Sequence, residues 1–206
     1  MHGHQDRILT THVGSLPRTV EVLDAMKAKF TGGDFSEDAY QAEIAKGVVE
    51  IVKQQADLGI DVVADGEMSK PGFFSYIEER LDGFEARPDE KYNLFAAEIA
   101  AFPEYYEDYF ARAMLGGTVV PMYPSYCVGP ISYKGEAALR RDIDNLKAAM
   151  KGVDVEGAFI PAVAPAGVGY NEHYKTEEEF AEAVAEALRT EYEAIVEAGF
   201  LLQIDD

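Results

Sequence analysis

The sequence has a single cysteine, Cys127, and few basic residues. One cysteine excludes a framework of intrachain disulfides and fits a reducing compartment, so we expect a cytoplasmic protein. Lysine and arginine total 18 against 38 aspartates and glutamates, which gives a formal charge of −20 at neutral pH. Such an acidic chain is a poor partner for nucleic acid or for an anionic membrane surface.

Long hydrophobic runs and nucleotide-binding motifs are also absent. No apolar stretch approaches the length of a transmembrane helix, and the start, MHGHQDRILTTHVG, lacks an apolar run of signal-peptide length. Neither GxGxxG nor GxxxxGKS/T follows the first predicted strand. These are the usual phosphate-binding motifs of doubly wound nucleotide-binding folds, so their absence argues against such a fold. The 206-residue chain is 48% hydrophobic, as in globular proteins, and we expect a single domain over residues 1–206.

Short apolar segments alternate with segments of helical periodicity. The pattern predicts strands at residues 7–14, 60–65, 125–133, 157–165 and 200–205. Apolar spacings of three and four predict helices at residues 19–30, 36–59, 73–84, 135–152 and 176–199. An aromatic stretch at about residues 85–124 is interpreted as an irregular helical insertion. Strands separated by helices indicate an α/β fold with a parallel sheet and right-handed crossovers.

A parallel sheet of this kind is either doubly wound or closed into a (β/α)8 TIM barrel. Polar residues directly follow several predicted strands, and in a barrel these positions converge on the face where active sites lie, which favours the barrel. A barrel needs eight strands and about 250 residues. We therefore expect only about the first five βα units, in a chain truncated at its C-terminus.

Three strand ends carry the main candidates for binding chemistry. Glu67 follows a strand through Gly66, and its carboxylate suits binding an ammonium group or acid–base chemistry, unless it is only a solvated acid. Gly14 and Ser15 offer an amide and a hydroxyl to a carboxylate. Asp205 ends an apolar strand, where an unpaired acid costs free energy, so a role in a site is favoured.

Four further residues can be interpreted either as functional or as purely structural. His12 is a candidate base or metal ligand, although a lone strand histidine is more often a core residue. Arg18 either anchors an anionic substrate tail or pairs with a helix acid. Cys127 is more often an inert buried thiol than a nucleophile. Asp206 is either a second ligand-facing acid or part of a frayed end. No metal site can be built from the residues of this chain.

The segments ILTTHVGSLPR, SEDAYQAEIAKGVVEIVKQQADLGIDVVADGE and LLQIDD resemble, in order, the catalytic barrel of cobalamin-independent methionine synthases, above all their short single-barrel type II relatives. The resemblance implies zinc-dependent transfer of a methyl or alkyl group to a small thiol such as homocysteine, as in 5-methyltetrahydropteroyltriglutamate–homocysteine methyltransferase. It implies that Val13 and Ser15 contact the amino-acid substrate and that Glu67 and Asp205 bind its ammonium group. The family's zinc ligands follow the QID strand, so they are expected in the missing C-terminal part.

Departures from the family pattern leave the alkyl donor open. Asp206 stands where the family usually has glutamate, SYC replaces a basic residue followed by cysteine, and MSK replaces PER. The acidic composition offers few anchors for a polyglutamylated folate. An epoxide-opening alkyltransferase of the coenzyme M type is therefore an alternative, and so is a non-catalytic module that pairs its exposed strand edges with another chain. A porphyrin-type decarboxylase would need an arginine cluster that the sequence lacks.

Overall fold

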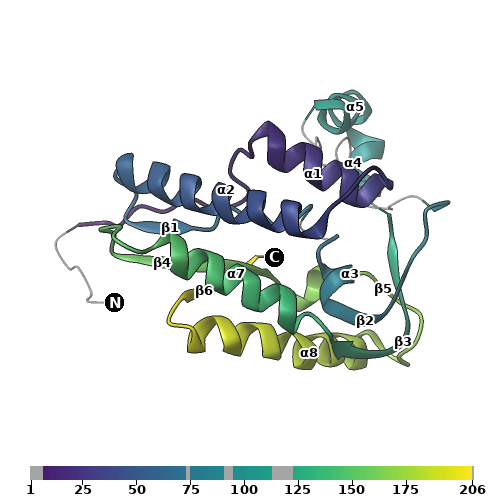
Figure 1. Cartoon of the computed structure of the whole chain (residues 1–206). Helices are drawn as coiled ribbons and strands as arrows, with labels where there is room; N and C mark the ends of the chain where they lie inside the picture. The colour runs from purple at the N-terminus through teal and green to yellow at the C-terminus, as the bar shows by residue number, and fades with distance from the viewer. Residues whose placement is uncertain (1–6, 73–74, 91–94, 113–122, 206) are drawn as a thin grey trace.

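The structure, a computed structural model, describes residues 7–72, 75–90, 95–112 and 123–205 (Figure 1). The helices are α1 Val20–Thr31, α2 Glu37–Asp57, α3 Ile77–Arg80, α4 Ala96–Ala101, α5 Pro103–Arg112, α7 Glu136–Ala149 and α8 Glu177–Glu197. The strands are β1 Val62–Ala64, β2 Leu81–Ala86, β3 Ser125–Tyr133, β4 Gly157–Val163, β5 Tyr170–Asn171 and β6 Leu201–Asp205. A short 3-10 turn covers Pro165–Gly167. None of the described helices is long and apolar enough to cross a membrane.

The first sheet is parallel and has the strand order β1-β4-β6. Its central strand, β4, pairs with β1 at Ala64–Phe159 and with β6 at Val163–Asp205. Helices α2, α7 and α8 lie side by side over one face of this sheet (Figure 1). All three strands and the helices α2, α7 and α8 form where the sequence pattern predicted them. Because the three strands run in the same direction, the carboxyl ends of β1 and β6 lie at the same edge of the sheet.

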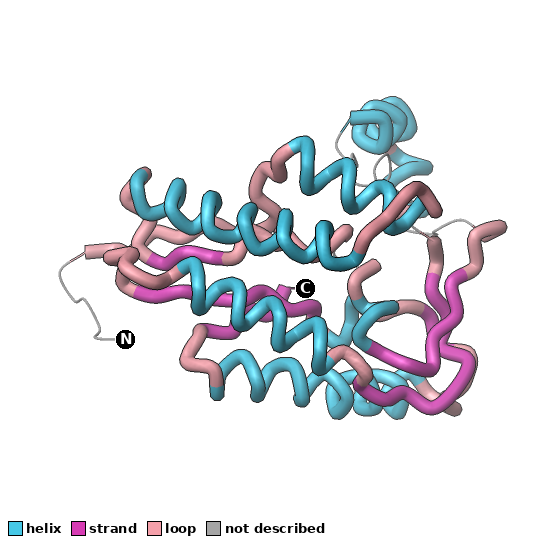
Figure 2. Tube along the Cα trace, in the orientation of Figure 1, coloured by secondary structure: helices cyan, strands magenta, loops and turns pink. Residues whose placement is uncertain are grey.

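The second sheet has the order β2-β3-β5 and corrects the prediction of one parallel sheet of five strands. Strand β3 was expected in that sheet, but it pairs antiparallel with β2 and parallel with β5. Figure 2 shows the two groups of strands apart from each other. The prediction failed because a strand's partner depends on contacts remote in sequence, which local periodicity does not encode.

The predicted helix over residues 73–84 is also wrong in its second half. Within its described part, only Ile77–Arg80 is helical, and Leu81–Ala86 continues as strand β2. Gly83 has φ +91°, and a Cβ added there would lie 2.7 Å from the Pro130 carbonyl oxygen of the neighbouring strand. The strand register shifts at this glycine, so close approach of two backbones overrides the helical pattern.

The predicted strand over residues 7–14 reduces to one isolated bridge, between Thr11 and Val62. The Asp61 carboxylate accepts a hydrogen bond from the Thr10 amide at 2.7 Å, a donor that a continuous ladder would use. The Asp61 and Val62 amides also donate to the Thr10 carbonyl, at 3.1 and 3.0 Å, so side-chain and backbone bonds at this one point fasten the segment to the start of β1.

The aromatic region predicted as an insertion contains α4 and α5, while residues 85 and 86 belong to β2. Residues 91–94 and 113–122 lie outside the described residues. Tyr106 stacks on Phe95 with ring centroids 5.5 Å apart, and Tyr105 stacks on Tyr109 at 6.0 Å. The Tyr106–Phe95 contact therefore joins α5 to the residue that precedes α4, and the Tyr105–Tyr109 contact lies within α5.

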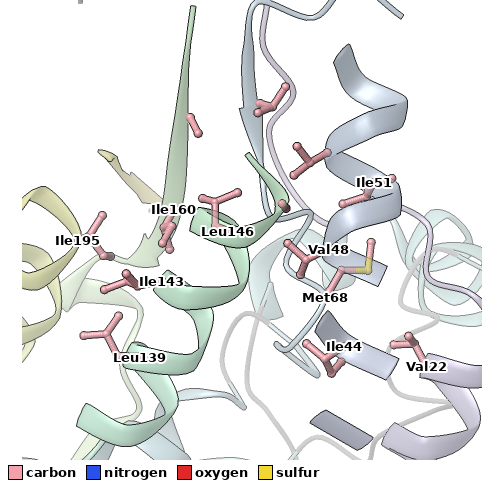
Figure 3. Close-up of a cluster of buried hydrophobic side chains, with 14 of the residues drawn as sticks. Val22, Ile44, Val48, Ile51, Met68, Leu139, Ile143, Leu146, Ile160 and Ile195 are labelled. Carbon is pink, nitrogen blue, oxygen red and sulfur yellow. The ribbon is translucent and has the colours of Figure 1, made fainter. Parts of the chain in front are cut away.

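The main hydrophobic core lies between the first sheet and helices α1, α2, α7 and α8 (Figure 3). Its labelled members are Val22, Ile44, Val48, Ile51, Met68, Leu139, Ile143, Leu146, Ile160 and Ile195. Met68 comes from the loop after β1, and a Cβ added at Gly47 would lie 3.5 Å from its sulfur. Burial of this side chain, worth about 1.5–3 kcal/mol, anchors the loop that carries Glu67.

Candidate functional site

The loop after β1 turns sharply through two residues with left-handed backbone. Gly66 has φ +67° and Glu67 has φ +56°, an uncommon conformation for a residue with a side chain. The Glu67 amide donates to Oδ1 of Asp65 at 2.9 Å, which holds the turn. The Asp65 side chain is buried, and this burial raises its pKa to about 6. The turn places the Glu67 carboxylate at the carboxyl end of the sheet.

Ser15 and Glu67 are in direct contact. Ser15 Oγ donates a hydrogen bond to Glu67 Oε2 at 2.5 Å, and the Leu16 amide donates to the Gly66 carbonyl at 3.1 Å. These bonds fasten the segment after the Thr11 bridge to the loop after β1. Two of the residues singled out in the sequence are thereby brought together.

Arg18 holds the backbone of the same loop. Its guanidinium donates to the carbonyl oxygens of Glu67 at 2.7 Å and Lys70 at 2.6 Å. Burial is the main cause that lowers the Arg18 pKa below its ordinary value. These contacts position the loop, and anchoring of an anionic substrate tail by Arg18 stays a prediction.

Asp205 lies on the opposite side of β4 from Glu67, and both line one narrow pocket. The other side chains and backbone segments that line it include Lys70, Tyr76, Pro161 and Val163. The space between these groups is too narrow for a water-sized sphere. Asp205 Oδ1 accepts a hydrogen bond from Gln203 Nε2 at 2.7 Å. The parallel register explains the proximity, because β1, β4 and β6 end at the same edge.

Lys70 and Tyr76 are pocket residues that the sequence reasoning did not select. Lys70 is 5% exposed; its Nζ donates to the Pro161 carbonyl and lies 4.8 Å from the centre of the Tyr76 ring. The Tyr76 hydroxyl accepts from the Val163 amide at 2.8 Å, and burial raises its pKa. The available signal was the position of Lys70 in the GEMSKP loop, three residues after Glu67.

The other described candidates are not among the residues that line this pocket. Val13 is 64% exposed, and His12 is half-buried with an Nε2 atom that is buried and has no hydrogen-bond partner among them. Cys127 is buried in the second sheet, where its thiol contacts the Gly129 carbonyl at 3.3 Å and burial raises its pKa. Asp206 lies outside the described residues.

A zinc ion would need a cluster of histidine, cysteine or carboxylate ligands. In the described part of the chain, no three such side chains gather closely enough to hold a metal ion. Glu67 and Asp205 share their pocket with the Lys70 ammonium, which is a poor neighbour for a cation. The described donor set therefore does not fit zinc.

A family model described as the catalytic domain of cobalamin-independent synthase matches residues 8–186. The chain belongs to this family. The matched range contains both strand-end loops, with Ser15 and Glu67, and it stops short of Asp205. The resemblance seen in the sequence motifs is confirmed.

The curated relatives match a short part of the chain. A protein of Pasteurella multocida named 5-methyltetrahydropteroyltriglutamate–homocysteine methyltransferase is 40% identical over 75 residues, and one of the same name from Corynebacterium efficiens is 33% identical over 75 residues. The matched stretch is 36% of this chain and 10% of each relative.

The solved structures of the family agree with the fold over nearly the whole chain. A B12-independent methionine synthase from Shewanella sp. W3-18-1, in complex with selenomethionine, superposes on 96% of this chain with a TM-score of 0.65 at 18% identity. A putative B12-independent methionine synthase from Listeria monocytogenes covers 97%, with the same TM-score and 22% identity. This chain spans 51% and 53% of those two chains, about half their length.

Proposed function

We propose that this chain provides the amino-acid binding part of a methyl- or alkyltransferase that acts on a small thiol, with homocysteine as the acceptor. One observation carries the proposal: Glu67, oriented by Ser15, and Asp205 line the same pocket at the carboxyl edge of a parallel sheet. The relatives named as homocysteine methyltransferases support the choice of acceptor.

The barrel belongs to this proposal. We infer that β1, β4 and β6 are part of a (β/α)8 barrel, with about five βα units in a single domain over residues 1–206. Two features support it: helices cover one face of the sheet, and the apolar side chains of Val62, Ala64 and Phe159 cluster separately, apart from the main core under the helices. In a barrel this second cluster would line the interior.

The chemistry of the site suits a ligand that carries an ammonium group. Carboxylates of Glu67 and Asp205 can each accept a charge-assisted hydrogen bond from a substrate ammonium group. Ser15 restrains the Glu67 carboxylate, so less side-chain freedom is lost when the ligand binds. A coenzyme M-type thiol has no ammonium group and would leave both acids unpaired, which favours an amino-acid acceptor over that alternative.

The proposal also covers the cofactor, the methyl donor and the location of the protein. The family resemblance implies zinc, and because the described residues do not fit a zinc site, its ligands would lie outside them. The relatives are named for a 5-methyltetrahydropteroyltriglutamate donor, and we propose a donor of this class for this chain. The cytoplasmic location stays a prediction.

Calorimetric titration of the 206-residue chain with L-homocysteine tests the function. Glu67→Gln removes the charge that would bind the ammonium group, so the dissociation constant should rise by about tenfold or more. Glu50→Gln, an exposed position on α2, is the matched control and should bind as the wild type does. Equal binding by wild type and Glu67→Gln, or no binding by either, would refute the proposal.

A further inference from the structure

Helix α7 carries a row of alternating charges on its outer face. The row consists of Glu136, Arg140, Asp144 and Lys147, which are all exposed. Their spacings of four, four and three residues place them on one face of the helix, in the order negative, positive, negative, positive. Among the described residues, none of these four side chains forms an ion pair or a hydrogen bond within the chain. All four charges are therefore available to a partner.

The same four side chains border a groove between α7 and α8, two helices that lie side by side in Figure 1. The groove has a volume of about 590 Å³. Most of its other lining residues are small or apolar: Ala137, Leu139, Ile143, Thr190, Ala194 and Ala198. Small side chains let a second helix approach closely, since the distance between packed helix axes depends on the side chains at the contact. The groove can thus receive a helix, with the row of charges at its rim.

The charge row is complementary to itself when two copies of α7 run antiparallel. In that arrangement Glu136 faces Lys147 of the second copy. The same register brings Arg140 next to Asp144 of the second copy, because both pairs are centred at the same point of the helix, beside residue 142. A two-fold axis through this point repeats each pair, which gives four contacts between opposite charges.

The local charge also favours a second copy at this face. The chain as a whole has 38 acidic and 18 basic residues, so two copies carry a net repulsion. Helix α7 departs from this balance, since it exposes Arg140, Arg141 and Lys147 against two exposed acids, Glu136 and Asp144. Two copies can therefore meet at α7 without the repulsion that the net charge would otherwise produce.

We propose that α7 and the groove beside it form the interface of a homodimer, in which α7 packs antiparallel against α7 of a second copy about a two-fold axis. The interface lies on the outer side of the helix layer, away from the pocket of Glu67 and Asp205, and does not depend on the proposed function. A contact made mainly by one pair of helices is at the small end of specific interfaces, so we expect a dissociation constant on the order of tens of micromolar.

Sedimentation equilibrium of the 206-residue chain, from about 1 to about 500 µM at roughly physiological salt, tests the interface. Lys147→Glu places an acid opposite Glu136 at two symmetric positions, so the dissociation constant should rise by about tenfold or more. Glu136→Lys should weaken the dimer to a similar extent. The double variant Glu136→Lys/Lys147→Glu exchanges the two charges and should restore the dissociation constant to within about threefold of the wild type. The two residues lie about 16 Å apart along one helix, so this rescue requires a contact between copies.

Lys53→Glu is the matched control, because it makes the same change of net charge at an exposed site on α2 and should leave the dissociation constant within about twofold. A wild-type chain that stays monomeric over the whole concentration range would overturn the inference. So would a dimer that both single variants leave intact, since its contact would lie on another face. A double variant as weak as the single ones would contradict the antiparallel pairing, because the two residues would then not face each other.

Discussion

The hydroxyl of Ser15 lies 2.5 Å from a carboxylate oxygen of Glu67, across 52 residues of sequence. This contact joins the first strand-end segment to the loop after β1 and fixes the carboxylate on which the proposed site depends. Because the two residues come from separate segments, the contact can form only when the carboxyl edge of the first sheet is correctly folded.

Ser15→Ala removes this hydrogen bond and frees the Glu67 carboxylate. We expect the free energy of unfolding to fall by about 1–2 kcal/mol, since hydrogen bonds to charged groups contribute in this range, and homocysteine binding to weaken severalfold. Urea unfolding and calorimetry measure the two effects. The exposed Ser132→Ala should leave both unchanged. If Ser15→Ala matched it, the contact would have no energetic importance.

Asp65 should make stability depend on pH in an identifiable direction. Its pKa is raised to about 6 by burial, while an unfolded aspartate titrates near 3.9. Between these values the folded chain binds a proton that the unfolded chain does not, so folding is favoured as the pH falls from about 6 to 4. Relative to Asp65→Asn, the wild type should gain on the order of 2–3 kcal/mol over this window.

Denaturant unfolding of both proteins at several pH values between 4 and 7 measures this difference. Asparagine keeps an oxygen that can accept from the Glu67 amide, so the variant isolates the effect of ionisation. Parallel stability curves for the two proteins would contradict the raised pKa.

Arg80 joins α3 to α7 and α8 in the protein interior. It is 4% exposed, donates to Asp142 at 2.5 Å and lies 3.8 Å from Glu191, which also accepts from the Tyr133 hydroxyl. Arg80→Met would leave two buried carboxylates without a cation, at a cost of about 3–5 kcal/mol. Thermal and urea unfolding check this against Arg140→Met, an exposed position on α7. Similar midpoints for the two variants would contradict it.

Gly83 is required by a close backbone approach as well as by its positive φ. A Cβ there would lie 2.7 Å from the Pro130 carbonyl, whereas Gly152, with φ +77°, has nothing within 4 Å of its added Cβ. We expect Gly83→Ala to lower stability by about 1–3 kcal/mol more than Gly152→Ala, because both suffer backbone strain but only one a clash. Equal losses in urea unfolding would show that the β2–β3 contact is looser than described.

The sequence alone predicted the elements whose signals are local. Serine and threonine are favoured at helix N-caps, and the side chains of Ser36 and Thr176 accept hydrogen bonds from the amides of Ala39 and Glu179. The helices that follow, α2 and α8, carry the apolar stripe that the spacing indicated. The strand-end loops were found for the same reason, since a polar residue after a short apolar run is visible without knowing its neighbours.

Only the tertiary structure decided which segments meet. Strand β2 forms where part of a helix was predicted, because its backbone packs closely against β3. The segment over residues 7–14 does not form a continuous ladder, because the Thr10 amide donates to the Asp61 carboxylate and not to a neighbouring strand. The burial of Lys70 was equally hidden, since residues that surround it, such as Tyr76, Pro161 and Asp205, come from distant parts of the chain. Helix propensity and capping act within a few residues, whereas strand pairing and the solvation of a charge depend on atoms that only folding brings together.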